Sequence, residues 1–172
     1  MSAAPRGLYV VMGVAGAGKT HIGAAFAHAI GVEFVDGDSY HPPTNVAKMS
    51  SGVPLTDEDR QGWLRTLAAL LRQARDAGTG LVLTCSALKR SYRDLLRAES
   101  GAPGLRFVFL RGDRDLIAAR LAGRRVHFWP ASLLDSQFDA LEEPSSDEEA
   151  WVCDVAQSPE TIVAELVTRV RV

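Results

Sequence analysis

Residues 13–20 read Gly-Val-Ala-Gly-Ala-Gly-Lys-Thr and match the pattern G-x-x-x-x-G-K-[ST] at every position. In this pattern the glycines let backbone N–H groups turn inward around phosphate oxygens, the lysine reaches the outer phosphates, and the last hydroxyl faces Mg²⁺. An apolar run, Leu8–Met12, precedes the loop, and the alanine-rich segment 21–30 follows it. Strand, loop and helix in this order favour a phosphate-binding loop, and the helix N-terminus adds positive potential. The alternative is a glycine-rich turn that carries Lys-Thr by chance.

Composition limits the class of protein. The chain has 172 residues, which fit one domain (1–172) with a sizeable core, and 47% of them are apolar. The formal net charge of −2 gives no basic field for nucleic acid. Because Cys85 and Cys153 each close a predicted buried strand, a reduced, cytoplasmic setting fits better than a disulfide framework. No run approaches about 20 apolar residues and residues 1–7 hold no apolar signal, so we expect no association with a membrane.

Short apolar runs alternate with helix-length segments along the chain. The runs are Leu8–Met12, Glu33–Asp36, Leu81–Cys85, Arg106–Leu110 and Trp151–Asp154. Their nearly continuous apolar character is typical of strands buried on both faces. The helix-length segments are 21–30, 58–77 (with Thr56 as its cap), 89–99, 113–122, 131–141 and 159–170. This pattern predicts an α/β fold with helices on both faces of a parallel sheet, and ligands bind such sheets where the strands end.

Two carboxylates follow the second predicted strand in Asp36-Gly37-Asp38. They could hold a water of Mg²⁺ and orient an acceptor hydroxyl. The alternative is that both only form turns and cap a helix. Because the third predicted strand ends in Cys85 rather than in an acid, we expect Asp36 to be the carboxylate on the metal side.

Basic residues follow the third strand. Ser86 stands where a helix is predicted to begin, as a possible N-cap, and Lys89, Arg90 and Arg93 occupy the first turns. Cations there oppose the helix dipole by about a few tenths of a kcal/mol each, which suggests an anionic substrate. A solvated helix face is the alternative.

A second basic group follows the fourth strand. Arg120 and Arg124 are four residues apart and share one helix face, ahead of His127, Phe128 and Trp129. Arginines on a movable segment commonly stabilise a phosphoryl group in transfer, so we expect a lid at about residues 123–135. Surface solubility is the alternative. Trp63 and Trp151 are predicted to be core residues.

Three classes of phosphate-loop protein remain. A regulatory GTPase should carry Asp-x-x-Gly and Asn-Lys-x-Asp, and neither is present. A motor, transporter or assembly ATPase usually needs an acid at a strand end and a larger chain. A small-molecule or nucleoside monophosphate kinase needs one compact domain, an acceptor region after the second strand (about residues 37–64) and an arginine-rich lid. This chain offers all three features of a kinase.

Longer blocks of the sequence resemble the gluconokinases of the phosphate-loop type. They are Asp36-Gly-Asp38-x-x-His41-Pro42-x-x-Asn45-x-x-Lys48-Met49, Gly52-x-Pro54-Leu55-x-Asp57-x-Asp59-Arg60-x-x-Trp63-Leu64, Cys85-Ser86-Ala87-Leu88-Lys89-x-x-Tyr92-Arg93-Asp94-x-Leu96-Arg97, and Arg124-x-x-His127-Phe128 with Ser136-Gln137-Phe138 and Leu141-Glu142-x-Pro144. The resemblance implies ATP-dependent phosphorylation of the 6-hydroxyl of D-gluconate, with Mg²⁺. It also implies an adenylate- and shikimate-kinase-like sandwich, a five-stranded parallel sheet in the order 2-3-1-4-5, and a homodimer.

Roles for single residues follow from the strand ends and the resemblance together. We expect Lys19, Asp38, Arg120 and Arg124 to be catalytic. The expected nucleotide-binding residues are Gly13, Val14, Ala15, Gly16, Ala17, Gly18, Lys19, Thr20, Arg120 and Arg124. The expected substrate-binding residues are Asp38, His41, Lys48, Arg60, Ser86, Lys89, Arg93, His127 and Gln137. Metal contacts are expected from Thr20 and, through water, from Asp36. Another anionic hydroxy acid such as shikimate, or a nucleotide-binding regulator without turnover, remains open.

Overall fold

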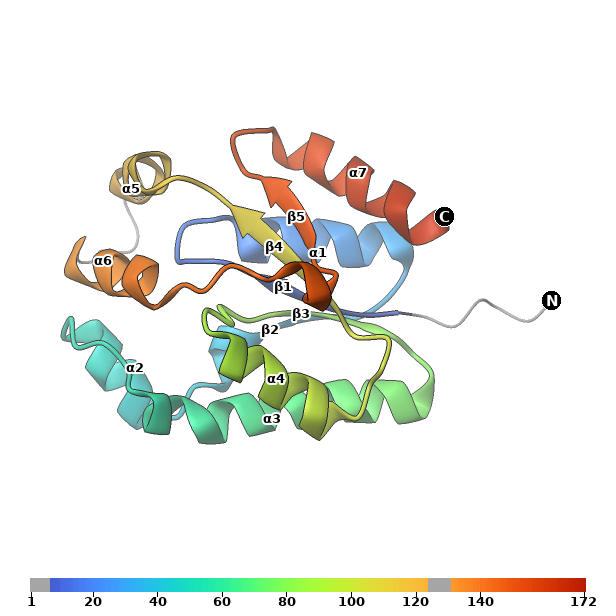
Figure 1. Ribbon diagram of the computed structural model, residues 1–172, viewed down its shortest axis with the longest axis horizontal. Coiled ribbons are helices and arrows are strands. Elements are labelled where there is room, and N and C mark those ends of the chain that lie inside the picture. Colours follow the sequence, from blue (N-terminus) through green and yellow to red (C-terminus); the bar gives the residue numbers. More distant parts are fainter. Residues whose placement is uncertain (1–6, 124–130) are drawn as a thin grey trace.

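The computed structural model describes residues 7–123 and 131–172. Over these residues one parallel sheet of five strands runs in the order β2-β3-β1-β4-β5 (Figure 1). The strands are β1 (Leu8–Met12), β2 (Phe34–Asp36), β3 (Leu81–Thr84), β4 (Arg106–Arg111) and β5 (Trp151–Asp154). In the register of the sheet, Val10 of the central strand lies between Leu83 and Phe107. The predicted α/β class and the order 2-3-1-4-5 are confirmed.

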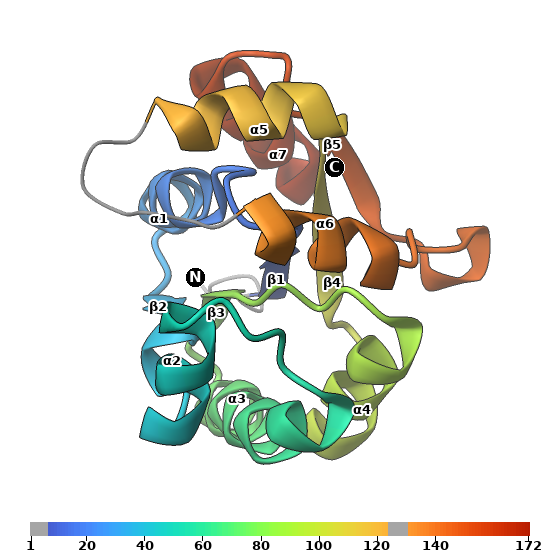
Figure 2. The ribbon, with the colours of Figure 1, turned by 90° about the vertical axis from the view of Figure 1, so that its left-hand side faces the viewer.

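Helices cover both faces of this sheet. In Figure 1, α1 (Lys19–Ile30) and α7 (Pro159–Arg171) lie on one face, and α3 (Asp57–Ala77) and α4 (Arg90–Ser100) on the other. The remaining elements are η1 (Gly37–Tyr40), α2 (Pro43–Ser50), α5 (Arg114–Ala122), α6 (Ala131–Ala140) and η2 (Ser146–Glu148). Figure 2 shows that α2, α5 and α6 gather at one end of the sheet. Across the described ranges, no helix is long and apolar enough to cross a membrane.

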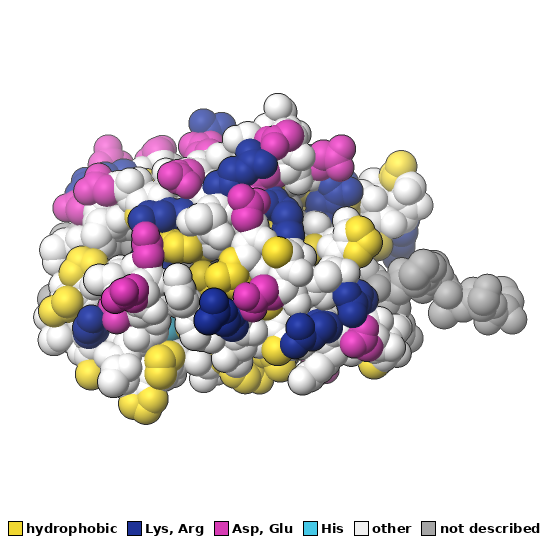
Figure 3. Space-filling view, turned by 60° about the horizontal axis from the view of Figure 1, so that its bottom comes forward, with side chains coloured by type: hydrophobic (Ala, Val, Ile, Leu, Met, Phe, Trp, Pro, Cys, Tyr) yellow, Lys and Arg dark blue, Asp and Glu magenta, His cyan; other side chains and the backbone are white. Residues whose placement is uncertain are grey.

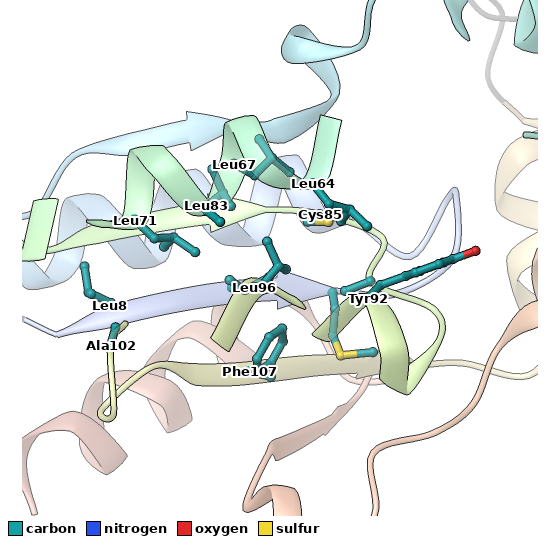
Figure 4. Packing of buried hydrophobic residues seen from close by; sticks show 14 of the residues in the cluster. Leu8, Leu64, Leu67, Leu71, Leu83, Cys85, Tyr92, Leu96, Ala102 and Phe107 are labelled. Carbon is teal, nitrogen blue, oxygen red and sulfur yellow. The ribbon is translucent and has the colours of Figure 1, made fainter. Parts of the chain in front are cut away.

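Alternation along β1 divides the core into two clusters. Leu8, Val10 and Met12 pack with α3 and α4, whereas Tyr9 and Val11 pack with α1 and α7. Successive side chains of a strand point to opposite faces, so a strand covered on both faces is apolar throughout. Figure 4 shows leucines of α3 and α4 packed onto β1 and β3 in the first cluster. Each large side chain buried in this way stabilises the fold by about 1.5–3 kcal/mol.

The start of α3 is a capping box, as the predicted Thr56 cap allows. The Thr56 hydroxyl accepts from the Asp59 N–H, and the Asp59 carboxylate accepts from the Thr56 N–H at 2.9 Å. The start of α4 differs from the prediction. Its N-cap is Lys89 rather than Ser86, and the Arg90 N–H donates instead to the Glu142 carboxylate at 2.8 Å. The helix α2 was not predicted, because its eight residues begin at the second proline of a Pro-Pro pair and carry little periodic pattern.

The acidic segment at residues 144–149 contains η2 and binds α4. Glu148 accepts from Nε of Arg93 at 2.7 Å and from Nη2 of Arg97 at 2.8 Å. The side chains of Arg93 and Glu148 are 0% and 1% exposed. Burial alone would raise the pKa of Glu148, but the hydrogen bonds from Arg93 and Arg97 lower it to about 2.

Acid should weaken the fold through Glu148. Its pKa is depressed in the folded state, so the stabilisation is fully present above the ordinary value of 4.5 and is lost as the pH falls toward about 2. Urea unfolding of the Glu148→Gln variant should give a free energy of unfolding about 3–5 kcal/mol below the wild type at pH 7. That gap should narrow below pH 4.5. The exposed Glu33 provides a control, and Glu33→Gln should follow the wild type at each pH. A gap for Glu148→Gln that stays constant with pH would contradict this role.

Candidate active site

The loop between β1 and α1 is built to receive an anion. Gly18, the N-cap of α1, has a φ of 95° and carries no side chain that could cap the helix. The first N–H groups of α1 therefore retain the positive potential of a helix N-terminus. Gly16 has a φ of 81°, and a Cβ there would lie 2.8 Å from Cγ of Leu121. Lys19 Nζ donates to the carbonyls of Gly13 and Val14 at 3.0 Å each, so the lysine lies along its own loop.

A cavity of about 700 Å³ lies beside this loop. That size is typical of sites for small molecules. The predicted site residues that line it are Ala15, Gly16, Gly18, Lys19, Thr20, Asp38, His41, Arg60, Ser86 and Gln137. Apolar side chains that complete the walls are Val46, Met49, Pro54, Leu55, Trp63, Leu121 and Leu133. The cavity therefore joins the phosphate loop to residues that follow β2 and β3.

The two carboxylates after β2 have different surroundings. Asp36 Oδ1 accepts from the Asp38 N–H at 3.0 Å and from the Thr84 hydroxyl at 3.1 Å. Asp36 therefore caps η1, which is the capping role that the sequence left open as the alternative to metal binding. Asp38 lines the cavity and its side chain is 65% exposed. Between them Gly37 must lack a Cβ, because that atom would lie 2.0 Å from the Thr84 carbonyl oxygen. The tight turn thus separates a fixed carboxylate from an accessible one.

His41 is held against the core beside Asp38. Its ring stacks on Trp63 with centroids 3.9 Å apart, and its side chain is 5% exposed. The Asn45 amide lies 3.3 Å from Nδ1, and the Nε2 atom lies 3.8 Å from the Asp38 carboxylate. Because an amide N–H donates, Nδ1 is assigned as the acceptor and Nε2 as the protonated nitrogen. Burial lowers the pKa of His41, so the ring is neutral near pH 7.

Trp63 has a second role beyond the predicted one. It is 2% exposed and belongs to the core, as predicted, yet it also lines the cavity. Its indole N–H donates to the Gly37 carbonyl at 2.8 Å, which fixes the turn that carries Asp38. Asn45, in the first turn of α2, supports His41, which precedes that helix in extended backbone, so no helical spacing in the sequence links the two residues.

Arg60 brings a guanidinium to the acceptor side of the cavity. Its Nη1 donates to the Leu55 carbonyl at 2.8 Å and to the Tyr92 hydroxyl at 3.1 Å. The Tyr92 hydroxyl in turn donates to Asp57. Figure 4 shows Tyr92 at the edge of the core cluster with its hydroxyl pointing away from the leucines. This network orients the Arg60 guanidinium through neutral groups, and none of its described hydrogen bonds is made to a carboxylate.

Three predicted cations do not line the cavity. Lys48 binds Asp59 at 2.8 Å, and Lys89 binds Asp57 at 3.0 Å. Arg93 is buried against Glu148 of η2, so its charge is neutralised inside the protein. These basic residues at the start of α4 therefore have acidic partners within the chain, so their placement does not by itself indicate an anionic substrate. Figure 3 shows acidic and basic side chains interspersed over one face of the molecule.

Gln137 closes the cavity from α6. Its side-chain carbonyl accepts from the Ala15 N–H at 2.7 Å. A backbone N–H of the phosphate loop is therefore bound to an uncharged oxygen of α6. The carboxylate of Asp135 in α6 binds Arg114 in α5. These contacts hold α6 across the loop.

The remaining expectations fall at the edge of the site or beyond it. Arg120 Nη2 donates to the Val155 carbonyl at 2.6 Å and does not line the cavity. Arg124 and His127 lie outside the described residues, as does most of the predicted lid. Within residues 7–123 and 131–172, no group of three or more His, Cys, Asp or Glu side chains could hold a metal ion. Cys85 and Cys153 are buried and free.

Comparisons with known proteins place the chain in a family. A family model described as shikimate kinase matches residues 15–171. Gluconokinase of Gluconobacter oxydans (strain 621H) is 47% identical over 167 residues, which cover 97% of this chain and 92% of that protein. The thermoresistant gluconokinase of Escherichia coli (strain K12) is 42% identical over 161 residues, which cover 93% of this chain and 91% of that protein.

A solved structure agrees with these relatives. A gluconokinase from Sinorhizobium meliloti 1021 superposes with a TM-score of 0.85 and 47% identity, covering 95% of this chain and 90% of that chain. The matches extend over nearly the full length of the chains compared. The chain therefore belongs to the gluconokinases, within the shikimate-kinase-like kinases that the family model describes.

Proposed function

We propose that this protein transfers the γ-phosphoryl group of ATP to the 6-hydroxyl of D-gluconate, giving 6-phospho-D-gluconate and ADP. The observation that carries the proposal is the single cavity that joins the phosphate loop to Asp38 and Arg60. Membership of the gluconokinases supports the choice of acceptor. A cytoplasmic location and a homodimer remain predictions.

The donor side would bind ATP through the phosphate loop. Lys19 would leave the carbonyls of Gly13 and Val14 and bind the outer phosphates, where its charge offsets the charge of the transferring group. The oxygen donors at this edge suit Mg²⁺: the Thr20 hydroxyl directly and Asp36 through water. When bound, the metal would neutralise charge on the phosphate oxygens. Arg120 and Arg124 remain predicted lid residues.

The acceptor side would bind gluconate through its charge and its hydroxyls. We assign Arg60 as the residue that binds the carboxylate of gluconate. Lys48 and Lys89 are less suited to this role, because each is paired with an aspartate and neither lines the cavity. Neutral His41 offers an N–H beside Asp38, and Ser86 and Gln137 offer further polar groups to the chain of hydroxyls. A cation with several neutral donors and acceptors matches a sugar acid.

Asp38 would orient the 6-hydroxyl and accept its proton. As the new bond from the hydroxyl oxygen to the γ-phosphorus forms, the bond to the β–γ bridging oxygen breaks and ADP leaves. The transition state of phosphoryl transfer is loose and asks little of a base, so the position of the hydroxyl matters most. The exposed carboxylate of Asp38, next to a turn fixed by Trp63, suits this task.

An ADP-release assay with several acceptors tests the proposal. D-Gluconate should support turnover, whereas shikimate and nucleoside monophosphates should not exceed the rate with ATP alone. Shikimate is included because the matching family model carries that description. Turnover with shikimate alone would replace the proposed acceptor, and no turnover with any acceptor would favour a nucleotide-binding regulator.

Replacing Asp38 should separate transfer from nucleotide binding. We expect Asp38→Asn to lower kcat about a hundredfold or more, since the carboxylate that orients the 6-hydroxyl and accepts its proton is lost. The Kd of a non-hydrolysable ATP analogue should change less than about twofold, because Asp38 lies on the acceptor side. Ser39→Ala alters the next, exposed residue of η1 and should leave both values unchanged. Unchanged kcat in Asp38→Asn would remove Asp38 from the reaction.

Gln137 should compete with the phosphates of ATP for the Ala15 N–H. Gln137→Glu places a carboxylate on that N–H, and a hydrogen bond to a charged acceptor contributes about 1.5–3 kcal/mol, against about 0.5–1.5 kcal/mol for a neutral one. Calorimetric titration with a non-hydrolysable ATP analogue should then give a Kd about tenfold higher or more. Gln137→Leu keeps the size but removes the acceptor, and its Kd should equal or fall below that of the wild type. Identical affinities in all three proteins would show that this contact does not oppose nucleotide binding.

A further inference from the structure

The connection between β3 and α4 touches both sides of the active site. We call residues 85–89 the β3–α4 loop. The Ser86 carbonyl accepts from the N–H of Gly13, the first residue of the phosphate loop, at 3.3 Å. The same residue lines the cavity where the acceptor is proposed to bind. A shift of this loop would therefore move an acceptor-side group relative to the phosphate loop.

The β3–α4 loop has an unusual backbone conformation. Ala87 has a φ of 46°, in the left-handed region, and its side chain is fully buried. A residue with a Cβ rarely adopts this conformation unless its surroundings impose it. The cause of the conformation must therefore lie in the contacts around Ala87.

Arg93 supplies those contacts from α4. Its Nη1 donates to the carbonyls of Ala87 at 2.9 Å and Leu88 at 3.2 Å. Its Nε and Nη2 donate to the two oxygens of Glu148 at 2.7 and 3.0 Å. One planar guanidinium thus binds the loop on one side and a buried carboxylate on the other. A lysine could not make both sets of contacts, because its ammonium lacks the fork.

Leu88 links this arrangement to the segment that follows α6. The Leu88 carbonyl that accepts from Arg93 also accepts from the Glu142 N–H at 2.8 Å, just after α6. In α6, Gln137 contacts the phosphate loop at Ala15. The buried pair therefore lies where the β3–α4 loop, the segment after α6 and η2 meet. A buried ion pair contributes little net stability compared with apolar packing of similar volume, so net stability alone does not account for this pair.

We propose that Arg93 and Glu148 are positioning residues, which hold the β3–α4 loop so that Ser86 stays aligned with the phosphate loop. This proposal rests on the proposed kinase reaction but not on the identity of the acceptor. Misplacement of reacting groups by about 1 Å can cost a hundredfold in rate, so a small shift of the loop should be visible in turnover. Neither residue lines the cavity, so neither is assigned a contact with substrate.

Arg93→Lys tests the proposal, because it keeps a positive charge beside Glu148 but loses the fork. The acceptor is whichever compound the wild type phosphorylates in the panel above, so a wrong acceptor and a wrong positioning role give different results. We expect kcat to fall about tenfold or more. The fraction of ATP hydrolysed without phosphorylation of the acceptor should rise, because water competes with a misaligned acceptor. Rates are measured well below the melting temperature of each variant.

Asp147→Asn is the matched control. It lies in the same η2 turn and loses the exposed pair with the Arg90 side chain, whose described partners are Asp147 and Asp94 rather than groups of the β3–α4 loop. Its kcat and its coupling of ATP use to product should equal those of the wild type. If Arg93→Lys does not fold, Glu148→Asp keeps the charge, draws the guanidinium away from the loop, and should show the same uncoupling. Wild-type kcat and coupling in a folded Arg93→Lys or Glu148→Asp protein, or equal losses in Asp147→Asn, would overturn the proposal.

Discussion

Parallel pairing of β1 between β3 and β4 is the constraint on which the site depends. The carboxyl ends of parallel strands meet at one edge of a sheet, and the connections on either side of the central strand diverge there. The phosphate loop after β1 therefore lies beside the turn after β2 and the loop after β3. Residues separated by more than sixty positions, such as Gly13 and Ser86, become hydrogen-bonded neighbours for this reason.

The charges of the protein divide into paired groups and cavity groups. Exposed pairs such as Arg90 with Asp147 contribute little to stability, since water and salt screen them. The buried pair of Arg93 and Glu148 is different, because removing one partner leaves a charge in a medium that solvates it poorly. Among the described lining residues, Lys19 and Arg60 supply the lysine and arginine charges, one at each side of the cavity. This separation suits a reaction that brings two anions together.

The sequence predicted the central strand well because burial on both faces imposes a continuous apolar run, as in Leu8–Met12, where all five residues are buried. The edge strand β5 was found from its short apolar run although only Cys153 in it is buried. The sequence predicted the phosphate loop because that chemistry needs fixed spacing within eight residues. The sequence could not reveal that Arg93 pairs with Glu148, because Glu148 is 55 positions away and is brought near only by folding. Basic residues look alike in a sequence whether they face a substrate or a buried carboxylate. The stacking of His41 on Trp63 likewise depends on how η1 returns over α3.

The groups that would bind ATP already have acceptors within the protein. Lys19 binds two carbonyls of its own loop, and the Ala15 N–H binds Gln137. Binding of the nucleotide would exchange these hydrogen bonds for others, so each new bond contributes only the difference between a phosphate oxygen and a neutral one. The exchange would also release α6 from the phosphate loop at Ala15. Binding of ATP would in this way change the contacts of α6, the helix that closes the cavity on the acceptor side.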